Sequence, residues 1–271
     1  MTMGKRIAFI GGGNMASAII GGLLRQGFAP GQIDVVDPWA EARERLQKDY
    51  VAQAEAGAFL AAADMVVWAV KPQTFKEAAT QVRAHNTGAL HLSVAAGIRS
   101  DSIAQWLGTE RIIRTMPNTP ALIGKGMTAL FARPAVTQAD KDWAGEVIAT
   151  TGAFLWLTAE DQLDAVTAIS GSGPAYMFYF MEAMTDAGAQ MGLDRAQAYQ
   201  LAVATFIGAG ELARASTEPP ETLRAKVTSK GGTTYAAITS MDESGIKTAF
   251  AKALFAAQKR ATELGNEFGG S

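Results

Sequence analysis

Short apolar runs, separated by small and polar residues, recur along the chain up to about residue 159. Runs of roughly four to eight apolar residues bounded by turn residues are typical of strands buried on both faces of a parallel sheet. Segments of helical composition precede several of these runs, so we expect a mainly parallel sheet of about eight strands. The expected strands are Arg6–Ile10, Ile33–Asp37, Met65–Val70, Leu90–Gly97, Arg111–Pro120, Met127–Ala132 and Ala153–Thr158.

The pattern changes at about Glu160. Beyond this residue alanine, leucine and methionine dominate, as in AVATFIGAGELARAS and FAKALFAAQKRATEL. Their apolar residues recur at the spacing of a helix rather than that of a strand. The sequence therefore predicts an α/β fold with two domains, a sheet domain over residues 1–159 and an all-helical domain over residues 160–271.

A glycine-rich turn follows the first expected strand. Gly11, Gly13 and Ala16 fit the pattern G-x-G-x-x-[G/A], between that strand and a helix expected over Asn14–Gln26. In this context the first glycine permits a tight turn and the second lets the backbone approach a pyrophosphate. The alanine lets the helix pack closely on the sheet, and the helix N-terminus attracts phosphate. An ordinary glycine-rich turn is the alternative, but the strands downstream favour a dinucleotide site.

The ends of later strands supply the remaining parts of the expected cofactor crevice. Asp37 closes the second strand about 20 residues after the glycines, where a ribose-binding carboxylate belongs. Lys71 and Pro72 follow the third strand, and Ala95–Gly97 end the fourth. Ligands of open α/β sheets bind outside the carboxyl ends of the strands, so we expect these loops to line one crevice with the glycines. For Lys71 and Pro72 a simple turn is the alternative.

Two polar loops interrupt the helical half, SGSGPAY at Ser170–Tyr176 and TSKGGTT at Thr228–Thr234. Helix capping can explain both loops. In the first, Ser172 or Gly173 would cap a helix that has Pro174 in its first turn. In the second, Thr233 or Thr234 would cap the helix that begins at YAAI. The functional alternative is a substrate site, because hydroxyls and glycine N–H groups at a helix start can bind an anionic group.

Charge and composition exclude several classes of protein. With 24 Lys and Arg against 26 Asp and Glu, the net charge of −2 gives no electrostatic support for a nucleic-acid or anionic-membrane partner. The chain has no cysteine, and its two histidines, His85 and His91, share no metal-ligand spacing, so no metal site is expected. The apolar runs are too short to span a membrane, and the first strand leaves no room for a signal peptide. We therefore expect a cytoplasmic protein.

Groups for acid–base catalysis are few in the helical half. This half has no histidine, no lysine lies between Lys141 and Lys226, and the chain has no Tyr-x-x-x-Lys pair. A hydride transfer to an imine tolerates this scarcity, because an imine is basic enough to arrive already protonated. The protein then has to hold the substrate over a nicotinamide and bind its anionic end.

Seven sequence blocks, in order, resemble pyrroline-5-carboxylate reductase over essentially the whole chain: GGGNMASAIIGGL, AVKPQ, SVAAGI, RTMPNTPALIGKG, AVTAISGSGPAYMF, GLDRAQAY and VTSKGGTT. The resemblance implies a Rossmann-type dinucleotide-binding domain followed by an all-α dimerisation domain. It also implies homodimers that often assemble into decamers. The expected reaction reduces L-1-pyrroline-5-carboxylate to L-proline with NADPH or NADH. A reductase of another imine or keto acid, and an NAD(P)H sensor without turnover, are the alternatives.

The resemblance also implies the roles of individual residues. Thr234 is the expected catalytic hydroxyl that meets the ring nitrogen of the substrate. The expected pocket around the substrate carboxylate comprises Val227, Ser229, Gly231, Gly232 and Thr233. The expected cofactor contacts are Ile10, Gly11, Gly12, Gly13, Asn14, Met15, Asp37, Ala69, Val70, Lys71, Pro72, Ala95, Ala96, Gly97 and Asn118.

Asp37 departs from the family's usual small polar residue after the second strand. A carboxylate there suits a free ribose 2′-hydroxyl and repels a 2′-phosphate. Arg43 and Arg45 lie just downstream and can offset that repulsion, although arginines on a solvated helix face are the alternative interpretation. The cofactor is therefore left as NADPH or NADH.

Overall fold

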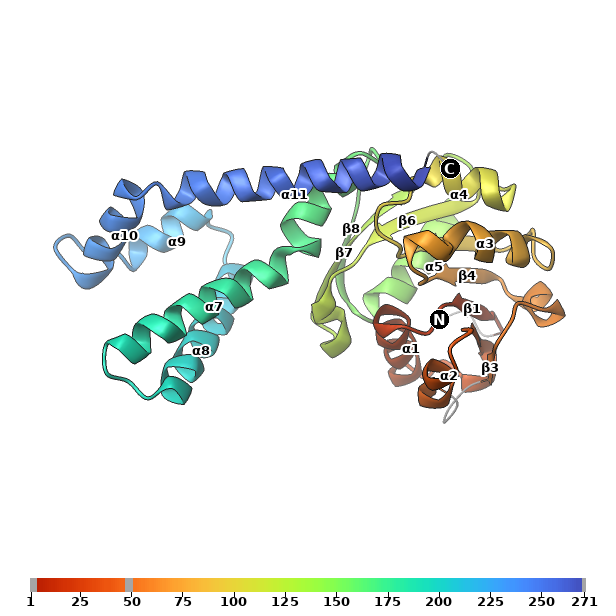
Figure 1. The fold of residues 1–271 in the computed structure, drawn as a ribbon, viewed down its shortest axis with the longest axis horizontal. Coiled ribbons are helices and arrows are strands. Elements are labelled where there is room, and N and C mark those ends of the chain that lie inside the picture. The colour runs from red at the N-terminus through yellow and green to blue at the C-terminus, as the bar shows by residue number, and fades with distance from the viewer. Residues whose placement is uncertain (1–3, 47–50, 270–271) are drawn as a thin grey trace. The chain divides into compact units, whose positions relative to one another are not determined.

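The structure, a computed structural model, describes residues 4–46 and 51–269. The chain forms two compact units (Figure 1). The first comprises residues up to Ser172 together with the segment from Ala257 onward, and the second is Gly173–Ala256. The domain boundary expected from the sequence lies between residues 159 and 160, whereas the first compact unit continues to Ser172.

An eight-stranded sheet forms the centre of the first unit, in the order β3-β2-β1-β4-β5-β6-β7-β8. Strands β1 to β6 are parallel, β7 is antiparallel to β6, and β8 is parallel to β7. All seven expected strands are present. The eighth, β3, has only three residues, VAQ, and no apolar run marks it. The strands are β1 Ile7–Ile10, β2 Ile33–Val36, β3 Val51–Gln53, β4 Met65–Trp68, β5 Leu90–Ser93, β6 Ile112–Met116, β7 Gly126–Ala132 and β8 Gly152–Trp156.

Helices cover both faces of the sheet, which explains why strands such as β1 and β4 are continuously apolar. Alternate residues of β1 belong to different cores, Ile7 and Phe9 to one, Ala8 and Ile10 to the other. The first core packs against α1 and α5, and the second against α3 and α4. The bounds are α1 Asn14–Arg25, α2 Ala40–Leu46, α3 Pro72–Arg83, α4 Ser100–Leu107 and α5 Gln138–Ala149, with short 3₁₀ turns at Pro30–Gln32, Ala58–Ala62 and Thr119–Ile123.

Polar contacts keep the segments at both ends of the helical half within the first unit. Asp164 lies on the short helix α6 (Gln162–Val166) and is buried. Its carboxylate accepts hydrogen bonds from Arg99 Nη2 at 2.7 Å and from Thr262 Oγ1 at 2.8 Å. Thr262 belongs to the end of α11 (Ile246–Gly269), the helix that runs from the second unit into the first. Such contacts between distant side chains cannot be predicted from the spacing of apolar residues.

The second unit is all helical, as expected. It contains α7 (Gly173–Gln190), α8 (Arg195–Ala215), α9 (Pro220–Lys226), α10 (Thr233–Glu243) and the first part of α11. Helices α7 and α8 approach closely, because a Cβ atom at Gly188 would lie 2.7 Å from the Ala198 Cβ atom. Asp194 caps α8, its Oδ1 atom accepting from the Ala196 N–H group at 2.9 Å.

His91 is a buried structural residue. Its Nδ1 atom accepts a hydrogen bond from Trp68 Nε1 at 3.1 Å, while Nε2 has no partner among the described residues. Burial, reinforced by the charge of Arg111, lowers the pKa of His91 from 6.5 to about 4. The imidazole is therefore neutral at pH 7, with its proton on Nε2.

This burial predicts a pH-dependent stability. The unfolded chain protonates His91 near pH 6.5 and the folded chain only near pH 4, so stability is lost as the pH falls through this window. The contribution is at most about 1.4 kcal/mol per pH unit. We expect His91→Asn, which keeps an acceptor for Trp68, to flatten this dependence in urea unfolding between pH 7 and pH 5. His85→Asn is the matched control, and equal pH slopes for both variants and the wild type would contradict the assignment.

Candidate functional site

The loops after β1 and β4 meet at Gly11. Its backbone has φ +95°, and a Cβ atom there would lie 2.5 Å from the Ala69 carbonyl oxygen. The Gly11 N–H group donates to the Val36 carbonyl at 2.8 Å, and the Ala69 N–H group donates to the Ile10 carbonyl at 2.8 Å. Only glycine fits this position, and the contacts bring together the carboxyl ends of β1, β2 and β4.

The start of α1 has open space around its backbone and N–H groups that are not hydrogen-bonded within the helix. Gly13 is exposed, has φ −72°, and a Cβ atom there would meet nothing within 4 Å. Gly13 makes no side-chain cap, and the first turn of α1 has no acidic residue. The first-turn N–H groups, including those of Asn14 and Met15, have no partner in the helix. This arrangement fits a pyrophosphate, which the N–H groups and the helix dipole would hold.

Asp37 is buried, 6% exposed, and its carboxylate binds the glycine loop. Oδ2 accepts from the Gly12 N–H group at 2.7 Å, and Oδ1 accepts from the Trp39 N–H group at 2.9 Å. A carboxylate has about four acceptor sites, so a ribose hydroxyl can still bind beside these two bonds. The sequence reasoning assigned Asp37 to the ribose alone and missed its role in fastening the loop, which no local pattern indicates.

Arg43 points to the end of β2 rather than away from the protein. Its Nη1 atom donates to the Asp37 carbonyl oxygen at 2.8 Å. The guanidinium therefore lies at the corner where the sequence expected a cation near the ribose. The side chain of Arg45 lies outside the described residues.

The remaining expected cofactor loops lie at the same edge of the sheet. Lys71 is exposed and precedes α3, where Pro72 occupies the first turn. Ala96, in the loop after β5, is exposed, whereas Ala95 is buried and Gly97 is half-buried. Gly97 has φ +73°, and a Cβ atom there would lie 3.2 Å from the Leu264 Cβ atom. The last part of α11 therefore packs on this loop within the first unit.

Asn118 connects two of the sequence blocks. Its Oδ1 atom accepts from the Met127 N–H group at 2.9 Å, and its Nδ2 atom donates to the Ser170 carbonyl and Oγ atoms, both at 3.2 Å. The amide thus holds the MPNTP loop against the SGSG turn. Its expected contact with the cofactor remains a prediction, and the structure adds a supporting role that sequence reasoning missed.

The SGSG block, Ser170–Gly173, begins in the π-helical turn Thr167–Gly171 and ends in the first residue of α7, so an N-cap does not explain it. Ser172 keeps a helical backbone with φ −84° and ψ −16°, so the turn passes directly into α7. A Cβ atom at Gly171 would lie 2.3 Å from the Met116 Cε atom, so the flexible end of the Met116 side chain packs against this glycine. Single π-turns of this kind occur frequently at functional sites.

The loop Thr228–Thr234 begins α10 with Gly232, not threonine, at the N-cap position. Thr233 and Thr234 are the first two helical residues, so the expectation that either of them caps α10 is wrong. The turn closes through the Gly232 N–H group, which donates to the Ser229 carbonyl at 3.0 Å, and Gly231 has φ +75°.

This loop presents unpaired donors. Within the described part of the chain, the hydroxyls of Thr233 and Thr234 make no hydrogen bond. The first turn of α10 carries no acidic residue. Val227, at the end of α9, is exposed beside the loop. The expected substrate residues therefore share one short segment that is suited to an anionic group: Val227, Ser229, Gly231, Gly232, Thr233 and Thr234.

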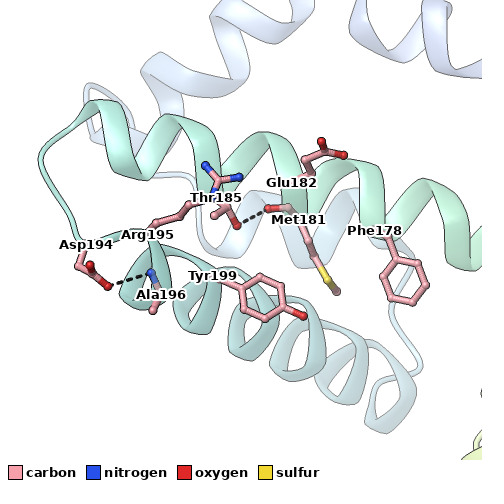
Figure 2. A pocket seen from close by; sticks show the side chains of 8 residues that line it. All are labelled: Phe178, Met181, Glu182, Thr185, Asp194, Arg195, Ala196 and Tyr199. Atoms are coloured by element: carbon pink, nitrogen blue, oxygen red, sulfur yellow. Dashed lines mark hydrogen bonds between the residues drawn. The ribbon is translucent and has the colours of Figure 1, made fainter.

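A groove of about 870 Å³ lies between α7 and α8, and sequence reasoning missed it (Figure 2). Phe178, Met181 and Tyr199 extend toward the space between these helices. Phe178 and Tyr199 are 64% and 57% exposed, which is unusual for large apolar side chains unless a partner covers them. The helical spacing of the sequence cannot distinguish a face packed inside the chain from a face packed on a partner. The lining residues are Phe178, Met181, Glu182, Thr185, Asp194, Arg195, Ala196 and Tyr199.

Across residues 4–46 and 51–269, no cluster of three or more His, Asp or Glu side chains is arranged to hold a metal ion. No helix in the same part of the chain is long and apolar enough to cross a membrane.

Comparisons with known proteins agree along the whole chain. Residues 160–264 match the pyrroline-5-carboxylate reductase dimerisation family, and residues 6–97 match the coenzyme F420-dependent NADP oxidoreductase family. The chain is 45% identical to the pyrroline-5-carboxylate reductase of Pseudomonas aeruginosa, over 97% of this chain and 98% of that protein.

Solved structures give the same result. A pyrroline-5-carboxylate reductase from Coxiella burnetii is 36% identical, with a TM-score of 0.88 over 96% of this chain and 98% of its own. A pyrroline carboxylate reductase from Plasmodium falciparum with NADP bound is 25% identical, with a TM-score of 0.86 over 98% of this chain and 100% of its own. This chain therefore belongs to the pyrroline-5-carboxylate reductase family.

Proposed function

We propose that this reductase binds its cyclic imine on the loop Thr228–Thr234, with the Thr234 hydroxyl at the ring nitrogen. The chain catalyses the reduction of L-1-pyrroline-5-carboxylate to L-proline, the last step of proline biosynthesis. The observation that carries the proposal is the start of α10, which has no side-chain cap and whose threonine hydroxyls and first-turn N–H groups have no partner among the described residues. The matching SKGGTT block supports the assignment.

The residues of this loop can bind both polar ends of the substrate. The first-turn N–H groups of α10 and the Ser229 hydroxyl would hold the carboxylate, favoured by the helix dipole. The Thr234 hydroxyl would accept a hydrogen bond from the N–H group of the iminium ring. It would donate one to the ring nitrogen once hydride transfer has made that nitrogen an amine. An iminium arrives already protonated, so the loop needs no strong acid, and both histidines of the chain lie before residue 92.

The glycine loop and its neighbours would hold NADPH or NADH. The bound nicotinamide supplies a hydride to the imine carbon. Gly11–Met15 would take the pyrophosphate at the start of α1, and Asp37 would take the ribose while fastening Gly12. Lys71 and Ala96 would line the crevice at the ends of β4 and β5. We assign cofactor binding to residues 1–159 and substrate binding with dimerisation to residues 160–271.

The chain is a homo-oligomer built through its helical region. We take the smallest assembly to be a dimer, in which the partner covers the groove between α7 and α8. Exposed Phe178 and Tyr199 support this assignment, because burial of such side chains is worth roughly 1.5–3 kcal/mol each. Assembly of dimers into decamers and a location in the cytoplasm complete the proposal.

A direct assay tests the proposed function. Purified protein is mixed with pyrroline-5-carboxylate and either NADPH or NADH, and the absorbance of the reduced nicotinamide is followed. We expect rapid oxidation of cofactor with the cyclic imine and slow or no oxidation with open-chain imines or keto acids. Binding of NAD(P)H without turnover would support the sensor alternative instead.

We expect Asp37→Ser to change both the affinity for the cofactor and the preference between NADH and NADPH. Serine is too short to bridge the N–H groups of Gly12 and Trp39, so we expect weaker binding of both cofactors. NADH should lose more than NADPH, since the variant removes both a partner of the ribose 2′-hydroxyl and the repulsion of a 2′-phosphate. Each hydrogen bond to the charged carboxylate is worth about 1.5–3 kcal/mol, or roughly 10- to 150-fold in dissociation constant.

Fluorescence titration of both cofactors measures this change. Asp34→Ser is the matched control, because Asp34 is an equally buried aspartate of β2 that pairs with Arg6 instead of the glycine loop. An NADH-to-NADPH affinity ratio that stays at the wild-type value would show that Asp37 does not contact the ribose.

A further inference from the structure

Trp39 has a large apolar side chain that is mostly exposed to solvent. It is 76% exposed, whereas Trp68 and Trp143 are at most 6% exposed and the other two tryptophans are partly buried. Exposing an indole ring to water forgoes roughly 1.5–3 kcal/mol of hydrophobic stabilisation. A ligand or partner that covers this ring would recover that free energy.

The backbone of Trp39 is attached to the glycine loop through one carboxylate. Asp37 accepts from the Trp39 N–H group at 2.9 Å and from the Gly12 N–H group at 2.7 Å. The Trp39 carbonyl accepts from the Arg43 N–H group at 3.1 Å, which begins α2. Trp39 therefore has a fixed backbone position at the carboxyl end of β2, next to the segment expected to hold the pyrophosphate.

The order of groups in a dinucleotide determines what lies beside this ring. In Rossmann-type sites the pyrophosphate lies at the first helix and the adenosine ribose at the acidic residue that ends the second strand. The adenine is attached to that ribose, so it extends past Asp37 toward the residues that follow. Aromatic side chains stack on nucleobases whatever the base, because every base has a π-face.

We infer that Trp39 is an adenine-stacking residue, whose indole covers one face of the adenine of NADPH or NADH. This inference rests on the proposed use of a nicotinamide dinucleotide. Both cofactors carry the same adenine, so Trp39 contributes affinity without preference. The preference belongs to Asp37 and to Arg43, which lies on the Asp37 carbonyl.

Trp39→Ala and Trp39→Phe test the inference with three ligands: NADPH, ADP and reduced nicotinamide mononucleotide, which has no adenosine. We expect Trp39→Ala to weaken ADP binding and raise the KM for NADPH by about 5- to 150-fold, the range of base-stacking contributions. The kcat at saturating NADPH and the KM for the mononucleotide should stay unchanged. Trp39→Phe should retain most of the affinity, and ADP should quench indole fluorescence in the wild type but not in Trp39→Phe.

Three outcomes separate the possibilities. Equal ADP affinity for Trp39→Ala and wild type would overturn the inference. A changed sedimentation coefficient of Trp39→Ala with unchanged ADP affinity would also overturn it, because the ring would then belong to a subunit interface. A wild-type protein that binds neither ADP nor NADPH would refute the proposed function itself and, with it, the stacking.

Discussion

Gly13→Val is expected to weaken cofactor binding severely while the protein still folds. Gly13 has φ −72° and ψ −172°, an extended conformation that valine adopts readily, and a Cβ atom there would meet nothing within 4 Å. That open space is where the backbone has to approach a pyrophosphate. Losing one or two charge-assisted hydrogen bonds from the N–H groups at about 1.5–3 kcal/mol each implies a dissociation constant raised roughly 10- to 10⁴-fold.

Cofactor fluorescence titration and thermal unfolding on the same variant measure both parts of this prediction. Gly31→Val is the matched control, because a Cβ atom at Gly31 also meets open space but lies in the 3₁₀ turn before β2. Gly11→Val should behave differently and destabilise the fold, since its Cβ atom would collide with the Ala69 carbonyl. A folded Gly13→Val protein with wild-type affinity would remove the glycine loop from the cofactor site.

Thr234→Ala is expected to lower kcat/KM by roughly 10- to 150-fold, the cost of one hydrogen bond to a charged partner at about 1.5–3 kcal/mol. Thermal stability should barely change, because Gly232 and not Thr234 holds the N-cap position of α10. A capping threonine would instead contribute about 1 kcal/mol to stability. The structure thus makes the two explanations of this hydroxyl separable by experiment.

Thr239→Ala is the matched control, since it removes a threonine hydroxyl from the same helix α10 beyond the loop Thr228–Thr234. Thr234→Ser should keep most of the activity because it keeps the hydroxyl. Kinetics with pyrroline-5-carboxylate and melting curves should be recorded for all three variants. A Thr234→Ala enzyme with wild-type turnover would disprove the catalytic assignment, and a lowered melting temperature alone would identify a structural role.

Local patterns were sufficient for the elements that position the site. The expected helix Asn14–Gln26 ends within one residue of the observed α1, Asn14–Arg25, because a glycine turn precedes it and apolar residues recur at helical spacing throughout. The strands were found for a similar reason. Because helices cover both faces of the sheet, strands such as β1 and β4 are apolar at every position and stand out from the surrounding sequence.

Only the tertiary structure decided which backbone groups the polar side chains bind. Asp37 reaches the Gly12 N–H group across 25 positions of sequence, and Asn118 reaches Ser170 across 52. Likewise, Gly232 rather than a threonine is the N-cap of α10, because the turn from Ser229 closes on Gly232 first. Hydrophobic periodicity records whether a residue is buried and on which face, since burial depends on local spacing. Hydrogen-bond partners depend on where distant segments meet, and a period of two or 3.6 residues carries no information about that.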